Sequence, residues 1–249
     1  MPFLADPAAV PTAALGGWDC HCHILPGLDD GPQSMDEAVA MVRMAAEHGT
    51  HAMIATPHHI EGLYPTLAGE ILERLAELRR RCEGEGLRIT LFPGQELALS
   101  PDLPARLGAG ELLSLGNVGH AVLIELPPLD PPPFWRQTFF ELGLRGLTPI
   151  IAHVERTVLV SRAELATEMV TAGAAFQVNA NAIGRRAPGR RVLDGWLRRG
   201  WIACLGSDAH DMRRRPPVLT TPDAARPWLE VAASQPAFLH PDATATIPS

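Results

Sequence analysis

Two histidines and two cysteines alternate near the start of the chain, in the stretch WDCHCHILPGLDDG. Such a set could belong to a zinc or redox centre, but the second ligand pair that a zinc finger needs does not follow. Side chains alternate between the two faces of a strand. We therefore expect His21 and His23 to point together and bind metal. Cys20 and Cys22 should point the other way, as small apolar fillers between a sheet and its helices.

Asp30 follows in the loop after this first short apolar run, and six more residues that can bind a metal lie in or just after later runs: His58, Glu96, Glu125, His153, Asp208 and His210. In β/α barrels the active site forms at the C-terminal ends of the strands. Any one of these residues alone is more often a simple hydrogen-bonding group. Nine such residues at the ends of six predicted strands together indicate a metal centre. The other histidines are expected to be structural or at the surface: His48, His51, His59, His120 and His240.

The runs themselves are rich in Ile, Val, Leu and Ala, as buried parallel strands should be. The predicted strands are Trp18–Cys22, Ala52–Thr56, Arg88–Phe92, Ala121–Leu126, Thr148–Ala152, Ala174–Val178 and Trp201–Leu205. Helical patterns separate them, with capping boxes expected at Ser34 with Glu37 and at Ser161 with Glu164. This alternation predicts an α/β fold with a parallel sheet. Seven units favour a closed or nearly closed barrel, and an open doubly wound sheet is the alternative.

The composition excludes or disfavours several classes of function. The net charge is −7, which argues against broad binding to nucleic acid or anionic lipid. All 21 basic residues are arginine, so a P-loop lysine, a Schiff-base lysine and a metal-bridging lysine carbamate are excluded. No apolar run is long enough for a membrane span and the start does not resemble a signal peptide. Four scattered cysteines suit reduced thiols, so we expect a cytoplasmic protein.

The length of 249 residues suits one domain, expected over residues 18–249 after a loosely ordered lead-in of residues 1–17. Inside it, the stretch CEGEGLR has the Cys-x5-Arg spacing of thiol-dependent phosphatases. Cys82 is expected at the end of a helix, where the dipole disfavours a thiolate, and Glu83 and Glu85 would repel a phosphate. We interpret this match as chance.

The motifs HCHILPGLDDGPQSMDEAVAMVRMA, ATPHH, PGQE, IEL, IAHVER and GSDAH together resemble those of bacterial manganese-dependent protein-tyrosine phosphatases. These enzymes belong to the polymerase-and-histidinol-phosphatase superfamily and are encoded with capsule or exopolysaccharide genes. The resemblance runs from about Trp18 to Pro217, and HCHILPGLDDGP with ATPHH is its specific part. It implies a distorted seven-stranded, TIM-like β/α barrel. It also implies a cluster of up to three metal ions, with manganese expected and iron or zinc as alternatives.

By motif position the nine residues named above match the ligands of that family, with Asp30 rather than Asp29 as the ligand in Asp-Asp-Gly. Arg156 in HVER and Arg215 in RRRPP match arginines expected to hold the phosphate. The implied reaction is phosphomonoester hydrolysis, with a metal-bridged hydroxide attacking phosphorus. The implied substrate is a phosphotyrosine protein, an autophosphorylating tyrosine kinase of polysaccharide export.

Alternatives remain for the roles of other arginines and for the function. Arg213 and Arg214 are expected to form a solvated basic turn, and a role for Arg185 and Arg186 at the mouth is a lesser alternative. The loop IEGLYPT after ATPHH borders the expected substrate. A histidinol-phosphatase-like enzyme acting on a small phosphomonoester is the first rival function. An amidohydrolase, a phosphoesterase acting on nucleic acid and an inactive scaffold barrel are weaker rivals.

Overall fold

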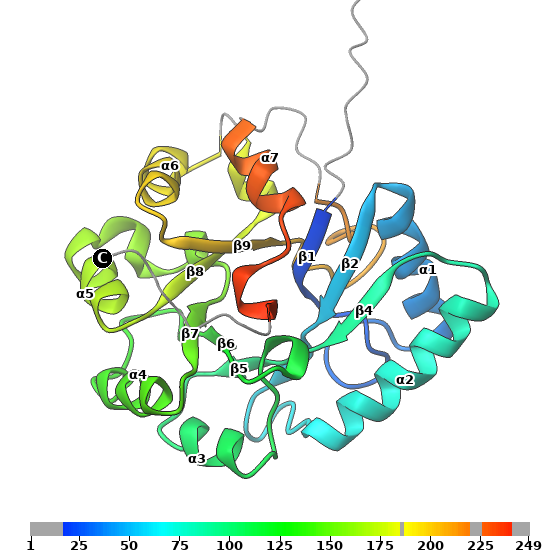
Figure 1. Cartoon of the computed structure of the whole chain (residues 1–249), viewed down its shortest axis with the longest axis horizontal. Coiled ribbons are helices and arrows are strands. Elements are labelled where there is room, and N and C mark those ends of the chain that lie inside the picture. The colour runs from blue at the N-terminus through cyan, green and yellow to red at the C-terminus, as the bar shows by residue number, and fades with distance from the viewer. Residues whose placement is uncertain (1–16, 185–186, 220–225, 241–249) are drawn as a thin grey trace, which may run out of the picture.

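The structure is a computed structural model that describes residues 17–184, 187–219 and 226–240 (Figure 1). The predicted lead-in, apart from its last residue, therefore lies outside the described residues, as do Arg185 and Arg186. Within the described ranges the strands are β1 (Gly17–Cys22), β2 (Thr50–Ala55), β3 (His58–His59), β4 (Thr90–Pro93), β5 (Glu96–Ala98), β6 (Ala121–Glu125), β7 (Thr148–Ile151), β8 (Ala175–Asn179) and β9 (Ile202–Gly206).

Helices follow most of the strands and surround them in Figure 1. The α-helices are α1 (Met35–Glu47), α2 (Ala68–Gly84), α3 (Leu103–Gly108), α4 (Trp135–Leu144), α5 (Ala163–Thr171), α6 (Arg190–Arg198) and α7 (Arg226–Ala233). Short 3-10 helices are η1 (Leu115–Asn117), η2 (Val154–Arg156), η3 (Val158–Ser161), η4 (Ala180–Ile183) and η5 (Ala237–Leu239). Each helix in the described part of the chain is too short or too polar to cross a bilayer.

The strands form two parallel sheets, in the orders β1-β2-β4 and β3-β5-β6-β7-β8-β9. β3 directly follows β2, and β5 directly follows β4, so the nine strands make up the seven predicted units. The first and last units lie side by side: the His23 amide donates to the Ala209 carbonyl, and the Asp208 amide to the His21 carbonyl, both at 2.8 Å. Contact between the two ends of the strand order is typical of a barrel and absent from an open doubly wound sheet. The predicted α/β class is confirmed.

Three apolar clusters fill this framework. One lies between β6–β8 and the helices α3–α7 and contains Phe139, Phe176 and Trp228. A second joins β1 and β2 to α1 and α2. The third unites residues of β1, β2, β6, β7 and β9, including Ile54 and Leu123, below the strand ends that carry the metal-capable residues. Each fully buried large side chain contributes about 1.5–3 kcal/mol of hydrophobic free energy to this framework.

The two predicted capping boxes have different outcomes. The Ser34 hydroxyl accepts from the Glu37 amide at 3.3 Å and caps α1, while the Glu37 carboxylate accepts from the Gln33 amide at 2.7 Å instead of from Ser34. The second box is wrong. Ser161 is the last residue of η3, where its hydroxyl donates to the Val158 carbonyl at 2.9 Å, and the N-cap position of α5 falls on Arg162, without a side-chain cap.

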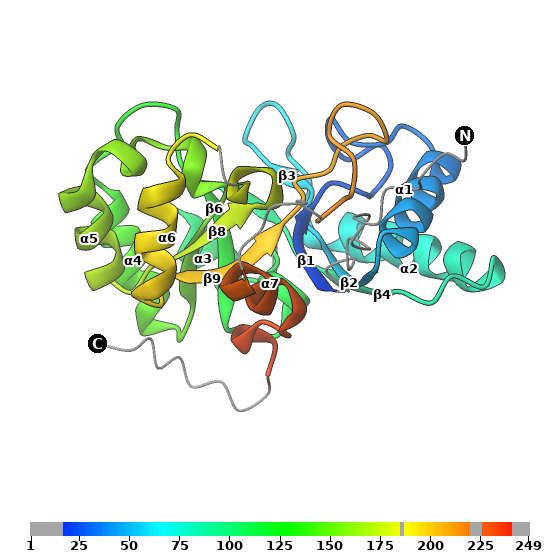
Figure 2. The same ribbon diagram turned by 90° about the horizontal axis from the view of Figure 1, so that it is seen from above.

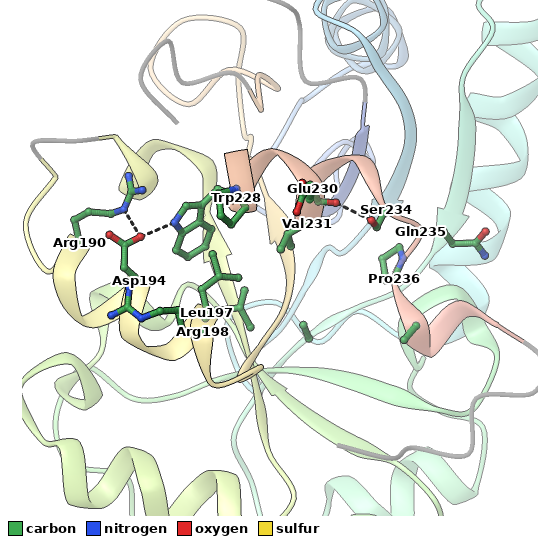
Figure 3. A pocket seen from close by; sticks show the side chains of 14 residues that line it. Arg190, Asp194, Leu197, Arg198, Trp228, Glu230, Val231, Ser234, Gln235 and Pro236 are labelled. Atoms are coloured by element: carbon green, nitrogen blue, oxygen red, sulfur yellow. Dashed lines mark hydrogen bonds and ion pairs between the residues drawn. The ribbon is translucent and has the colours of Figure 1, made fainter. Parts of the chain in front are cut away.

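The helix α7 packs against α6. Figure 3 shows Asp194 of α6 between Arg190 and Trp228, beside a cavity of about 720 Å³. The Asp194 carboxylate accepts from the Arg190 Nε at 2.8 Å and from the Trp228 indole N–H at 2.7 Å. Trp228 is fully buried and Arg190 is 9% exposed. One carboxylate thus accepts from both side chains, although Nη1 of Arg190 is also buried and has no partner among the described residues.

Replacing Asp194 with alanine should lower the free energy of unfolding by about 1–3 kcal/mol, because a buried guanidinium and a buried indole N–H both lose their acceptor. Urea unfolding followed by tryptophan fluorescence measures this change. Asp130→Ala is the matched control, since Asp130 pairs with Arg162 at 2.8 Å on the surface and should cost less than about 0.5 kcal/mol. Equal effects of the two variants would contradict this role of Asp194.

Candidate metal centre

The strand ends bring the predicted metal-binding side chains to one place. His21 in β1 and His23 just after it point together, as predicted, with their Nε2 atoms 3.2 Å apart. The register of β3 with β5 sets His58 directly beside Glu96. Asp30, Glu125, His153, Asp208 and His210 come from the loops or ends of other strands and approach the same cluster. In Figure 2 the loops after β1, β3 and β9 rise on the same side of the molecule.

Glu96 lies at the centre of this cluster and is fully buried. Its Oε2 is 3.1 Å from His21 Nε2, 3.2 Å from His23 Nε2 and 3.1 Å from His58 Nδ1. Its Oε1 is 3.0 Å from His153 Nε2. A carboxylate whose two oxygens meet four imidazoles is placed to bridge metal ions.

The remaining carboxylates divide the cluster into overlapping groups. Asp208 Oδ1 is 3.7 Å from the Nε2 atoms of both His21 and His23, and Asp30 Oδ1 is 3.3 Å from His210 Nε2. Three sets have donor atoms within 4.8 Å of one another: His23, Asp30, His58 and His210; His21, His23 and Asp208; and His58, Glu96 and Glu125. His153 lies outside these sets but reaches both Glu96 and Glu125, the latter at 3.8 Å. The three sets overlap, because the first shares His23 with the second and His58 with the third.

Hydrogen bonds show which nitrogens are free to bind a cation. His21 Nδ1 donates to the Gln177 amide oxygen at 3.0 Å, and His23 Nδ1 donates to Asp29 at 2.6 Å. With both Nδ1 protons engaged, the Nε2 lone pairs face each other and Glu96 at hydrogen-bond distance, an arrangement that requires a cation or an extra proton between them. In the described residues, buried His210 Nε2 has no hydrogen-bond partner, and the short contacts of His58 Nδ1 with Glu96 and of Glu96 Oε1 with His153 lack hydrogen-bond geometry. The donor set fits metal binding.

The charges of the site agree with this interpretation. Burial opposes the charged form of Glu96, but the imidazoles of His21 and His153 hold its pKa well below the usual range. Burial likewise opposes the charged form of His23, yet Asp29 and Glu96 raise its pKa to about 10. The carboxylates therefore favour positive charge at the position of His23 Nε2. Imidazole and carboxylate without thiolate suit manganese, iron or zinc.

Two of the three residues other than glycine that have a positive φ in the described chain belong to the cluster. His153 and Asp208 have φ angles of 29° and 54°, in the region that residues other than glycine rarely adopt. Strain of this kind persists only where the surroundings over-determine it, and it gathers at functional sites. Beside them Gly206 has no room for a side chain, because a Cβ there would lie 2.5 Å from the Cβ of His21.

Sequence reasoning missed the polar residues that orient the histidines. Gln177 on β8 is fully buried, and its Oε1 accepts from His21 Nδ1 and, at 2.6 Å, from the His153 amide. Its Nε2 donates to Asn179 at 2.9 Å, and Asn179 donates to Asp208 at 3.1 Å. A glutamine and an asparagine inside an otherwise apolar strand were the available signal.

Replacing Gln177 with methionine, which has a similar volume but no amide, should weaken metal binding about 10- to 100-fold. The His21 tautomer loses its fixing acceptor, and the His153 amide loses its partner. Metal titration followed by calorimetry measures the affinity. Gln137→Met on the exposed surface of α4 is the control and should leave it unchanged. An unaltered affinity in Gln177→Met would contradict the orienting role.

Asp29 and Asp30 take different positions, as expected for a single ligand in Asp-Asp-Gly. Asp29 faces away from the cluster centre and accepts from His23 Nδ1, from the His58 amide at 2.9 Å and from the Gly31 amide at 3.0 Å. Burial disfavours its charge, but His23 and these amides lower its pKa to about 2. Asp30 instead approaches the imidazoles of His58 and His210.

The two predicted arginines lie at the edge of the cluster. Arg156 Nη1 is 2.7 Å from Asp208 Oδ2, and Arg215 Nη2 is 3.1 Å from Asp30 Oδ2. Their side chains are 45% and 38% exposed, so each guanidinium borders both the cluster and solvent. Arg213 and Arg214 are exposed on a turn whose amides donate to Asp211, which agrees with the predicted basic turn.

The cysteine prediction is half correct. Cys22 packs with α1 and α2 as expected, but Cys20 lies with Ile54 and Cys204 in the cluster below the strand ends. The pairing of β1 with β2 shifts register between Asp19 and Cys22, which breaks the strict alternation of faces. Burial raises the pKa of both thiols, and neither belongs to a candidate metal group.

Residues rejected on sequence grounds also lie apart from the cluster. Cys82 is buried in the last turns of α2, and burial with Glu85 raises its pKa to about 11, which does not suit a nucleophile. His59, despite its neighbour His58, contacts the Thr66 carbonyl at 2.8 Å and Arg106 at 2.9 Å. It is structural, as predicted.

Comparison with known proteins gives consistent matches. A family model described as "Capsular polysaccharide synthesis, CpsB/CapC" matches residues 17–226. The tyrosine-protein phosphatase YwqE of Bacillus subtilis (strain 168) is 32% identical over 204 residues, covering 79% of this chain and 78% of that protein. The putative tyrosine-protein phosphatase CapC of Staphylococcus aureus is 31% identical over 208 residues, covering 81% and 80%.

A solved structure from work on YwqE of Bacillus subtilis and CpsB of Streptococcus pneumoniae also matches. Those two proteins are described as unique metal-dependent tyrosine phosphatases. The TM-score is 0.76 at 31% sequence identity, and the match covers 86% of this chain and 85% of the other.

Proposed function

Because the chain belongs to the capsular polysaccharide synthesis CpsB/CapC family, we propose that it is a metal-dependent protein-tyrosine phosphatase. The observation that carries this proposal is the buried cluster of imidazoles and carboxylates around Glu96, with two arginines at its edge. The similar proteins YwqE and CapC bear the names of tyrosine phosphatases, which supports the same chemistry here.

Nine residues would hold the metal: His21, His23, Asp30, His58, Glu96, Glu125, His153, Asp208 and His210. We propose up to three ions, manganese in the first place, with iron or zinc as alternatives that the same donors accept. Divalent ions at this place would supply an activated water as the nucleophile and positive charge for the phosphate oxygens.

The chain's own arginines would bind the substrate. Arg156 and Arg215 present guanidinium groups that can hold phosphate oxygens bidentately and offset the charge that grows in the transition state. Both now pair with carboxylates of the cluster, Asp208 and Asp30, which keeps them oriented toward it. A tyrosinate leaving group, with a reference pKa of about 10, needs less protonation than an alkoxide.

The substrate we propose is a tyrosine-phosphorylated protein, an autophosphorylating kinase of polysaccharide export. Its dephosphorylation would regulate capsule or exopolysaccharide synthesis, in keeping with the family. We place the reaction in the cytoplasm, where the four cysteines, which are all free and buried, would stay reduced.

The test compares hydrolysis of a phosphotyrosine peptide and of histidinol phosphate, each with Mn²⁺ and with a chelator. A metal-dependent preference for the peptide is the expected result. A preference for histidinol phosphate would keep the site but replace the proposed substrate with a small metabolite. Bound metal without turnover of either compound would overturn the proposal and favour a scaffold.

A further inference from the structure

The single tyrosine of the chain, Tyr64, stands beside the metal centre. Its ring lies 5.8 Å from the imidazole of His58, measured between centroids, and the two planes are only 11° apart. Ile60 and Tyr64 exchange backbone hydrogen bonds of 2.9 and 2.8 Å, and Gly62, with φ at 77°, closes the turn between them. A short, hydrogen-bonded turn therefore fixes an aromatic ring against a candidate metal ligand.

The ring lies between His58 and solvent, at the edge of the cluster. His58 contacts Glu96 with one ring nitrogen and approaches Asp30 with the other, at 3.8 Å, so Tyr64 is one side chain away from the centre of the cluster. In Figure 2 its turn, after β3, rises on the same side as the loops after β1 and β9. Tyr64 is only partly buried, so part of the ring faces solvent.

The charged groups at this edge are suited to the phosphate and not to an aromatic ring. Arg156 and Arg215 are guanidinium groups that suit a phosphate. Among the residues that the structure describes, Tyr64 is the only aromatic side chain other than histidine that packs on a candidate ligand. A phosphate ester held at the cluster would project its organic group outward, where the ring of Tyr64 offers an apolar, aromatic face.

We propose that Tyr64 forms the wall of a subsite for the aromatic ring of the substrate and thereby selects aryl over short alkyl phosphates. This inference rests on the proposed phosphatase function. Offset or edge-on contact between two rings stabilises the pair beyond its buried area. A short alkyl group such as that of phosphoserine has no ring to offer. Tyr64 acts on specificity, while the metal cluster and the arginines act on the phosphate.

The experiment measures binding of phenylphosphonate and methylphosphonate to the manganese-loaded full chain by calorimetry, so that it needs no turnover. For each variant the ratio of the two affinities is compared with that of wild type. Differences in metal loading or in the folded fraction affect both affinities and cancel in this ratio. The variants are Tyr64→Ala, Tyr64→Phe and, as a matched loss of an aromatic ring, Phe140→Ala on α4, where Phe140 is 61% exposed.

Wild type should prefer phenylphosphonate, and Tyr64→Ala should lose about 2- to 10-fold of that preference while its affinity for methylphosphonate stays unchanged. Tyr64→Phe and Phe140→Ala should retain the preference. The proposal is overturned if Tyr64→Ala keeps the preference, if both phosphonates weaken equally, or if Tyr64→Phe loses as much as Tyr64→Ala. Failure of wild type to bind either phosphonate would count against the phosphate site itself, whereas a change confined to the ratio concerns Tyr64 alone.

Discussion

Glu96→Gln is expected to lower kcat for a phosphotyrosine peptide at least about 100-fold and to reduce the amount of bound metal. Loss of an outer-shell partner alone costs about 10- to 100-fold, and Glu96 contacts four imidazoles directly. The amide keeps the shape of the side chain but removes the negative charge that stabilises cations between those nitrogens. Steady-state kinetics and metal analysis after dialysis measure the two effects.

Glu168→Gln is the matched control, because Glu168 pairs with Arg136 at 2.6 Å on the surface and lies on α5, outside the metal cluster. It should leave both quantities unchanged. Full metal content together with wild-type kcat in Glu96→Gln would remove Glu96 from the proposed ligands, and with it the idea of a carboxylate that bridges the ions.

Arg156→Ala is expected to lower kcat/KM by roughly 100- to 1,000-fold, the range seen when one preorganised donor to a developing oxyanion is removed. The metal content should stay close to that of wild type, since Arg156 contacts the cluster only through Asp208. Arg156→Lys should recover only part of the loss, because an ammonium group cannot hold two phosphate oxygens in the fork of a guanidinium.

Arg162→Ala provides the comparison, since this arginine follows closely in sequence and forms an exposed ion pair with Asp130. We expect wild-type kinetics from it. If Arg156→Ala lost its metal along with its activity, the arginine would be a support of Asp208 and not a group that binds phosphate.

Much of the fold was predictable because its signals are local. Each of the seven apolar runs became a strand unit, with ends that differ by a few residues, because buried parallel strands need short β-branched and aliphatic runs. The breaks between β2 and β3 and between β4 and β5 were not predicted. The cap at Ser161 failed because η3 runs through Ser161, so that the N-cap position of α5 falls on Arg162.

The candidate ligands were also visible in the sequence, because a parallel β/α fold collects its strand ends at one edge wherever the intervening helices lie. That rule needs only the order of the elements. It brought His21, His58 and His153 to one site although they are far apart in the chain. The nine assignments as ligands remain predictions, and the geometry of the cluster supports them.

The tertiary structure alone decided how these side chains are held. Gln177 orients His21 across 156 residues of sequence, and no local pattern can encode a contact of that separation. The register shift in β1 moved Cys20 to the interior, and the turn after β3 set Tyr64 against His58. Sequence determined which chemistry gathers at the strand ends, because periodicity and strand order are local properties. Protonation, orientation and specificity were left to packing, because they depend on atoms that only the folded chain brings together.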